Sequence, residues 1–299
     1  MHFLVLTLGS TISLADANPR FTSGNVSLDS PLDIAISWRM PQIGKDLKRL
    51  ARKVYLWPHD ILTGPVGREQ VEIFDDVLWL SKWQREQWIE VDSSFSRFNK
   101  IFGNGVDEKQ FKPIEERRNP FSCIYGSNYG RGLSILVNLW PKIKAEFPKA
   151  TLDVYYGWQH WGALSEQEEK DLRQKMDHLP DIHDHGCVGH EELNRGYETA
   201  SFWTYPCTKP ETFCITALRA QLAGAVPIII KHSALGETVR NGFYCDRVEH
   251  YLPLLRQAFL SAENISLEQR SQMGEFILQE FTWKQIAISC KKLFESLTF

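Results

Sequence analysis

The sequence predicts an α/β protein with parallel sheets, and three observations support this fold class. Short apolar runs alternate along the chain with amphipathic stretches of helical length, which is the pattern of βαβ units. The chain has 299 residues, enough for two ordinary domains with a core each. Its 43% apolar and 24% charged residues are typical of a globular protein. We therefore expect two Rossmann-like domains.

The first half of the chain contains the strands of the smaller predicted domain. We predict strands over residues 33–37, 53–57 and 76–80. The apolar start, residues 1–8, is too short to cross a membrane and lacks a basic leader, so we interpret it as a buried first strand. Residues 82–90 are predicted to form a helix with Ser81 as its N-cap.

The second half shows the alternation more clearly. The predicted strands span residues 122–126, 151–156, 182–187, 202–205 and 226–230. The predicted helices span residues 131–147, 166–178, 191–199 and 213–223, and a last helix spans 282–296. Ligands of parallel sheets bind at the carboxyl ends of the strands. We therefore expect a site in the loops that follow the first, second and fourth of these strands.

Charge and cysteine content exclude several classes of partner. The formal net charge is −3, so the chain lacks a basic field for nucleic acid. The basic cluster at residues 45–53 is interpreted as a solvated helix face. The six cysteines form no CxxC pair, which favours reduced thiols in the cytoplasm. No apolar stretch of about 18 residues occurs, so no membrane span is expected.

A glycine-rich turn, residues 126–132 (Gly-Ser-Asn-Tyr-Gly-Arg-Gly), follows a predicted strand and opens a helix. Glycines let the backbone approach an anion, a helix N-terminus offers free amides, and Arg131 can pair with phosphate. An ordinary tight turn explains the same residues, so both interpretations stay open. The turn is not a Walker loop, because no GK[ST] follows it.

A second segment, residues 206–216, again runs from a strand end into a predicted helix. Glu211 lies just before that helix, where Thr212, Phe213 and Cys214 offer backbone amides. The carboxylate is either a charge favoured by the helix dipole or a group that binds sugar hydroxyls. The Gly-Asn-Gly-Val-Asp turn at residues 103–107 is in isolation only a turn.

Taken together and in order, these segments resemble the retaining GT-B glycosyltransferases of the group 1, or family 4-like, type. Residues 102–113 (Phe-Gly-Asn-Gly-Val-Asp, then Phe-Lys-Pro) resemble the family's "PNGVD…F.P" segment. Residues 206–228 resemble "PS..E.fg...lEA...G.PvI", with Glu211 as the first glutamate. Shorter similarities lie at Trp57-Pro-His59-Asp60, Ser81, Arg131-Gly-Leu, Gly186 to Tyr197 and Phe281-Thr-Trp283. The similarity runs from about residue 53 to the C-terminus.

The resemblance implies a role for each matching residue. Arg131 would neutralise the donor diphosphate, Glu211 would contact the transferred sugar, and His59 would act near the reacting carbon; these three are the implied catalytic residues. The implied donor-binding residues are Gly126, Ser127, Arg131, Gly132, Thr212, Phe213, Cys214 and Arg219. The family needs no metal and no cofactor beyond its co-substrate, a nucleoside diphosphate sugar, and transfers to a carbohydrate or other hydroxyl acceptor with retention.

The chain departs from the family pattern in three places. Arg219 occupies the position of the second glutamate, which usually accepts hydrogen bonds from ribose hydroxyls, and an arginine cannot accept. Ser127 occupies the position of a phosphate-binding arginine. The N-terminal half is short, so that domain is either trimmed or part of a longer polypeptide. A non-catalytic GT-B relative that binds nucleotide or carbohydrate is the alternative function.

The predicted organisation is a shortened N-terminal domain over residues 1–95, a nucleotide-sugar domain over 96–281 and a helix, 282–299, that crosses back to the first domain. The two domains would face a cleft. A turn-rich stretch at residues 101–120 marks the boundary. His183, His185 and Cys187 alternate along a predicted strand like zinc ligands, but a histidine-rich strand face is favoured, and no metal is expected.

Overall fold

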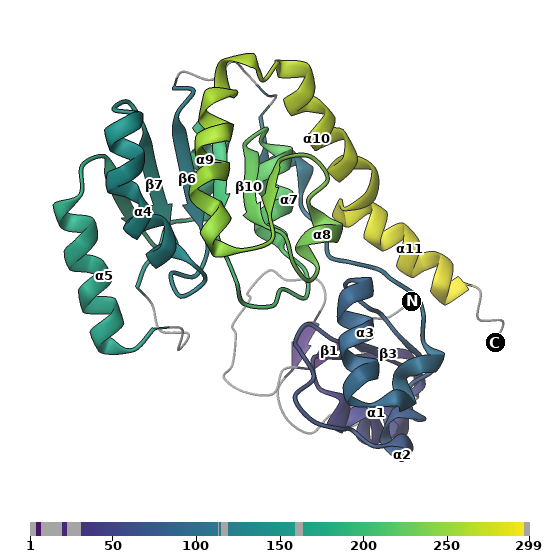
Figure 1. Cartoon of the computed structure of the whole chain (residues 1–299). Coiled ribbons are helices and arrows are strands. Elements are labelled where there is room, and N and C mark those ends of the chain that lie inside the picture. Colours follow the sequence, from purple (N-terminus) through teal and green to yellow (C-terminus); the bar gives the residue numbers. More distant parts are fainter. Residues whose placement is uncertain are drawn as a thin grey trace. The chain divides into compact units, whose positions relative to one another are not determined.

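The structure is a computed structural model, and it describes residues 4–6, 20–22, 31–112, 114, 119–158 and 164–295. The chain divides into two compact units, residues 1–102 and 103–299. Figure 1 shows both units in colours that follow the sequence. Pro113, residues 115–118 of the predicted boundary and residues 1–3 and 7–8 of the predicted first strand lie outside the described residues. Each unit is considered by itself.

The second unit is built on a six-stranded parallel sheet. Its strands are β6 (Ser122–Gly126), β7 (Thr151–Tyr155), β8 (Ile182–Gly186), β9 (Phe202–Tyr205), β10 (Val226–Ile230) and β11 (Phe243–Cys245). Their order is β11-β10-β9-β6-β7-β8, which is the Rossmann order. The strand order switches between β6 and β9, so the loops after these two strands flank the crevice where such sheets bind ligands.

The helices of the second unit lie between and after these strands in the sequence. They are α4 (Leu133–Glu146), α5 (Glu166–His178), α6 (His190–Thr199), α7 (Ile215–Leu222), α8 (Leu235–Thr238), α9 (Tyr251–Leu260), α10 (Leu267–Glu280) and α11 (Trp283–Glu295), with short 3₁₀ turns at Glu108–Gln110, Val248–His250 and Ala262–Asn264. In Figure 1, α4 and α9 lie on the near face of the sheet. Every residue of β6, β9 and β10 is buried, as expected for central strands covered on both faces.

The first unit contains a three-stranded parallel sheet in the order β3-β4-β5, formed by Leu32–Trp38, Ala51–Trp57 and Asp76–Val77. Its helices are α1 (Gly44–Leu50), α2 (Arg68–Val71) and α3 (Lys82–Val91), with 3₁₀ turns at Pro41–Ile43 and Ser93–Arg97. Strands β1 (Leu4–Leu6) and β2 (Arg20–Thr22) form a separate parallel pair. Trp79, Trp88 and Phe95 are buried at the centre of this unit's core.

The predicted strands at 122–126, 202–205 and 226–230 and the helix at 166–178 are confirmed with the same bounds. The Ser81 N-cap is also confirmed, because its side chain accepts a hydrogen bond from the Gln84 amide. The strand predicted at 76–80 is shorter: the Trp79 amide bonds to the Lys100 carbonyl, which takes the chain away from the sheet. The sequence patterns did not predict β11, α9 or α10.

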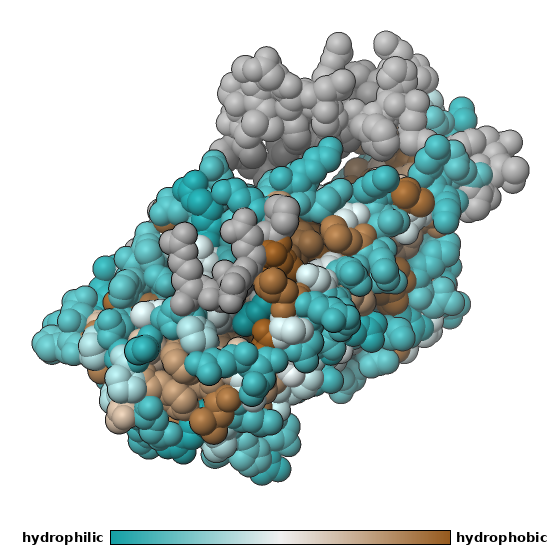
Figure 2. All heavy atoms as spheres, turned by 90° about the horizontal axis from the view of Figure 1, so that it is seen from above, coloured by the Kyte–Doolittle hydropathy of each residue, from teal (hydrophilic) through white to brown (hydrophobic). Residues whose placement is uncertain are grey.

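The described surface is ordinary for a globular protein. The face seen in Figure 2 is largely hydrophilic, with hydrophobic residues gathered in a few areas. Among the described residues, no helix combines the length and the apolar character that a membrane crossing requires. All six cysteines are free thiols.

Candidate functional site

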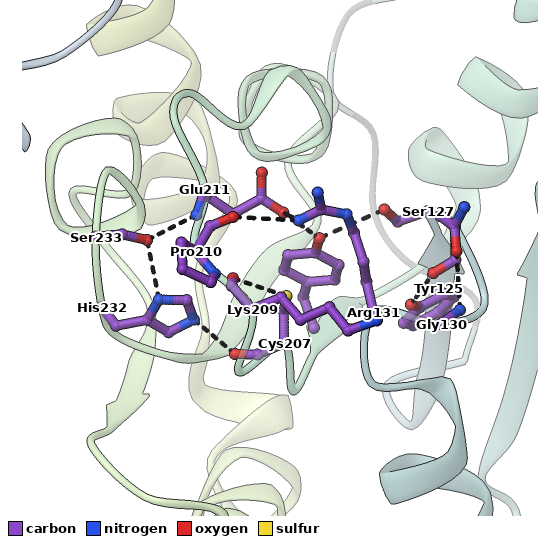
Figure 3. A network of polar contacts seen from close by, with 12 residues as sticks. Tyr125, Ser127, Gly130, Arg131, Cys207, Lys209, Pro210, Glu211, His232 and Ser233 are labelled. Carbon is purple, nitrogen blue, oxygen red and sulfur yellow. Dashed lines mark hydrogen bonds and ion pairs between the residues drawn. The ribbon is translucent and has the colours of Figure 1, made fainter. Parts of the chain in front are cut away.

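The site lies where the loops after β6 and β9 meet, at the switch in strand order. Arg131 comes from the first loop and Glu211 from the second. Their side chains form an ion pair of 2.6 Å between Arg131 Nη1 and Glu211 Oε1, which Figure 3 shows from close by. The Glu211 side chain is 12% exposed and that of Arg131 35% exposed. A ligand entering from solvent therefore meets the guanidinium before the carboxylate.

The carboxylate of Glu211 is held by a second donor. The Tyr205 hydroxyl donates to Glu211 Oε1 at 2.5 Å, and the Ser127 hydroxyl donates to the Tyr205 oxygen at 3.4 Å. Burial raises the pKa of Glu211, while the charge of Arg131 and the hydrogen bond from Tyr205 act in the opposite direction. The carboxylate thus depends on these two partners to stay ionised in its buried place.

The backbone of Glu211 is anchored to the loop after β10. Its amide donates to Ser233 Oγ at 2.9 Å, and its carbonyl accepts from the Ala234 amide at 3.1 Å. His232 Nε2 lies 2.7 Å from the Cys207 carbonyl, which can only accept, so Nε2 carries the proton. In the neutral ring Nδ1 then accepts from the Ser233 hydroxyl at 2.9 Å. Three loops are locked together by this chain of contacts (Figure 3).

Two glycines are required by close approaches at the first loop. Gly132 has φ +106°, and a Cβ built on it would lie 2.4 Å from the Pro206 carbonyl oxygen. A Cβ on Gly126 would lie 2.2 Å from the Tyr197 hydroxyl oxygen, which donates to the Gly126 carbonyl. Both predicted donor-binding glycines therefore let neighbouring loops and helices pack closely, and the two loops of the site touch at Gly132.

Backbone amides precede α7 at the site. We predicted this helix from residue 213, but it begins at Ile215, so Thr212, Phe213 and Cys214 form an extended approach to it. Within the described residues, no group accepts a hydrogen bond from the amide of Phe213 or Cys214. Such amides at the start of a helix are suited to bind an anion.

Arg219, on α7, contacts α6. Its guanidinium donates to Asn194 Oδ1 at 3.3 Å and lies 3.5 Å from His190 Nδ1, both on α6. Asn194 in turn donates to Gln110. Burial lowers the pKa of Arg219. The arginine thus joins α7 to α6.

Sequence patterns missed Asp184, a residue of β8 that connects two loops at the same edge of the sheet. Its carboxylate accepts from the Tyr129 hydroxyl at 2.5 Å, the Trp158 indole N–H at 2.7 Å and the Gly186 amide at 2.9 Å. The first two donors come from the loops after β6 and β7, and the third lies at the end of β8 itself. The sequence around a single aspartate near a strand end does not indicate these hydrogen-bond donors.

The histidines around Asp184 do not gather as zinc ligands. The His185 ring stacks on Tyr155 with centroids 4.3 Å apart, and its Nε2 lies 2.7 Å from Asp153 Oδ1. In the part of the chain that the structure describes, no group of three or more His, Cys, Asp or Glu side chains is placed to hold a metal. His185 therefore packs through a ring stack on Tyr155 and a hydrogen bond with Asp153.

The remaining predicted site residue, His59, belongs to the first unit. Its ring contacts Trp38 and Trp57, with centroids 5.5 and 5.4 Å away. Burial and the charge of Arg39 lower its pKa from 6.5 to about 4. His59 is therefore neutral at pH 7.

The pKa of His59 predicts a loss of stability in acid. The folded state resists protonation down to about pH 4, whereas the unfolded state takes up the proton near pH 6.5. The unfolded state then binds more protons between these values, so the free energy of unfolding falls by roughly 3 kcal/mol as the pH is lowered through this window. Denaturant titrations from pH 7 to pH 4 measure it. His59→Gln should flatten the dependence and His183→Gln, at an exposed position, should not; equal slopes in both variants would contradict the prediction.

Proteins of known structure are similar to this chain in fold. No family pattern and no curated protein matches the sequence. Anabaena HepE in complex with UDP is similar in structure, with a TM-score of 0.72 and 17% identity over 89% of this chain and 79% of that one. Sucrose-phosphate synthase from Thermosynechococcus elongatus has a TM-score of 0.69 and 15% identity over 88% and 73%.

A third similar structure is a trehalose-6-phosphate synthase, described in a study of glycosyl transfer with retention. Its TM-score is 0.66 at 10% identity, over 90% of this chain and 75% of that one. At such identities the comparisons establish the fold alone, and they agree with the parallel sheets described above. The chain has the GT-B glycosyltransferase fold, an α/β architecture with two parallel sheets.

Proposed function

We propose that the chain is a glycosyltransferase that moves a sugar from a nucleoside diphosphate sugar to a hydroxyl acceptor, with retention and without a metal. The observation that carries the proposal is the Arg131–Glu211 pair at the switch in strand order. A partly exposed guanidinium there can bind phosphate, and a fixed carboxylate beside it can accept from sugar hydroxyls. The two halves of a sugar nucleotide need these two kinds of group.

In the proposed reaction, the bond from the anomeric carbon to the diphosphate oxygen breaks, the acceptor oxygen bonds to that carbon, and the proton of the acceptor hydroxyl passes to the leaving diphosphate. Charge grows on the leaving diphosphate, and Arg131 together with the amides of Phe213 and Cys214 would stabilise it. Glu211 would orient the sugar through its hydroxyls. His59, neutral at pH 7, is proposed to act near the reacting carbon.

The nature of the donor is proposed by similarity. HepE has been solved with UDP and with UDP-glucose, and the pneumococcal O-GlcNAc transferase GtfA with UDP and GlcNAc. We therefore place uridine diphosphate sugars first among the donors, with a carbohydrate acceptor. With six free thiols, we propose the cytoplasm as the compartment.

A turnover assay tests this function. Wild-type protein is incubated with UDP-glucose and a pool of simple glycosides, and the release of UDP and the anomeric configuration of the product are followed by NMR. The proposal expects UDP release that depends on the acceptor and an α-linked product from the α-linked donor. Glu211→Ala is the inactive control, and Glu191→Ala, exposed on α6, is the matched active one. A β-linked product would refute retention, and no release from any sugar nucleotide would refute the enzyme.

Arg219 supports a second candidate function, a non-catalytic relative that binds nucleotide or carbohydrate. If Arg219 stands where a ribose-accepting glutamate is needed, Arg219→Glu restores an acceptor and should tighten UDP binding about tenfold, equal to roughly 1.4 kcal/mol. Arg219→Met, which removes the cation without adding an acceptor, is the control. Calorimetry measures both. No binding to the wild type and no gain in Arg219→Glu would favour the non-catalytic relative.

A further inference from the structure

An exposed tryptophan lies at the carboxyl edge of the first unit's sheet. Trp38 and Trp57 are the last residues of β3 and β4, and they are direct partners in the strand register. Trp38 is 61% exposed, which is unusual for so large an aromatic side chain. The carboxyl ends of parallel strands are where α/β sheets bind ligands. Trp38 is therefore a candidate ligand-binding residue.

The chain holds Trp38 in this exposed position at a conformational cost. Arg39, the next residue, has φ +70°, a left-handed conformation that costs free energy for a residue with a Cβ. Two hydrogen bonds enforce it: the Arg39 amide donates to the Trp57 carbonyl at 3.0 Å, and the Ser37 hydroxyl donates to the Met40 carbonyl at 2.5 Å. The backbone around Trp38 is thus held in place before any ligand arrives.

Polar groups of a particular kind lie beside the indole. The Arg39 guanidinium lies over the Trp38 ring, 5.0 Å from its centroid, and the residue as a whole stays 61% exposed. Arg39 Nη1 also contacts both carboxylate oxygens of Asp60, at 2.8 and 3.1 Å. The two charged side chains are about half exposed, so a ligand can reach both.

We propose that Trp38, Arg39 and Asp60 form a carbohydrate-binding platform that takes a pyranose ring. A pyranose offers an apolar face of C–H groups, which stacks on the exposed surface of the indole, and a rim of hydroxyls. Each hydroxyl both donates and accepts, so neighbouring hydroxyls match the carboxylate acceptor and the guanidinium donor. A lipid acyl chain at this place would bury the Arg39–Asp60 ion pair and offer it no hydrogen-bonding groups. Burying charged groups without such partners costs free energy. The proposal rests on the proposed function in one respect: it takes the bound sugar to be the acceptor of the transfer reaction.

Saturation-transfer NMR tests the platform with three probes: the methyl glycosides of glucose, galactose and mannose at millimolar concentration. We expect saturation to reach the ring C–H protons of at least one glycoside. Trp38→Ala should lower this transfer at least about fivefold, because the stacking surface is lost. Trp38→Phe keeps an aromatic face and should retain most of the transfer. Leu260→Ala, at a 75% exposed apolar position in the second unit, is the matched control and should behave as the wild type.

Three results in these experiments would overturn the platform. No transfer to any of the three glycosides would do so, as would transfer that Trp38→Ala leaves unchanged. Binding to phosphatidylcholine vesicles that Trp38→Ala abolishes, without glycoside binding, would assign the surface to lipid instead. UDP binding in the second unit is measured in parallel. A protein that binds glycosides through Trp38 but no nucleotide keeps the platform and loses the proposed function, and the reverse result keeps the function and removes this acceptor site.

Discussion

Replacing Arg131 with alanine should weaken UDP binding by at least about a hundredfold, because charge-assisted contacts to phosphate are worth roughly 3 kcal/mol or more in sum. The same change leaves the Glu211 carboxylate buried with only the Tyr205 hydroxyl beside it. We therefore also expect a loss of folding stability of about 1–3 kcal/mol, less than for a fully buried pair because Arg131 is partly exposed. Calorimetric titration with UDP and denaturant unfolding measure the two effects.

Two controls separate the charge from the fold. Arg131→Lys keeps the cation but loses the planar fork, so it should bind UDP with intermediate affinity. Arg195→Ala removes an exposed ion pair with Glu191 on α6 and should change neither property. UDP affinity that survives in Arg131→Ala would show that this guanidinium does not bind the diphosphate, and the assignment of the site to the β6 and β9 loops would fail with it.

Gly132→Ala should destabilise the second unit by about 2–4 kcal/mol. An alanine at φ +106° is strained, at a cost of roughly 1–2 kcal/mol. Its Cβ would also lie 2.4 Å from the Pro206 carbonyl oxygen, which forces the two site loops apart. Because Arg131 is the preceding residue and Glu211 lies on the opposite loop, nucleotide affinity should fall along with stability.

Gly64→Ala is the matched control for this prediction. Nothing lies within 4 Å of a Cβ built on Gly64, and its φ is not in the left-handed region. Chemical denaturation of both variants should show a large loss for Gly132→Ala and almost none for Gly64→Ala. Equal midpoints in the two variants would mean that the loops after β6 and β9 are not packed as described.

Much of the fold follows from local sequence patterns. The apolar runs of the central strands, and the polar stretch with its N-cap at residues 166–178, are each sufficient to predict an element. The bounds of these elements were therefore predicted correctly. The glycine-rich turn and Glu211 could also be located, because each lies between a clear strand and a helix. Local patterns failed where a strand is short or where the backbone pairs with a segment outside the sheet. Both apply at β5, where the Trp79 amide bonds to the Lys100 carbonyl.

The contacts within the site could not be predicted in the same way. The sequence pattern predicts Tyr205 to be a buried strand residue, and it does not indicate that the Tyr205 hydroxyl donates to Glu211. His232 and Ser233 lie in a loop with no motif, and only the packing of β10 beside β9 brings them to the Glu211 backbone. Asp184 gains two of its three donors, Tyr129 and Trp158, from loops far away in sequence. Such pairings depend on the strand order, which periodicity and composition do not reveal.

The central claim is that the loops after β6 and β9 bind a nucleoside diphosphate. Calorimetric titration of the wild-type protein with UDP, GDP, ADP and CMP tests it most directly. The account predicts one site with a dissociation constant in the micromolar range, or about −8 kcal/mol, for UDP and weaker binding of the others. Binding of none of the four nucleotides would contradict the account and leave the chain as a GT-B fold without a working donor site.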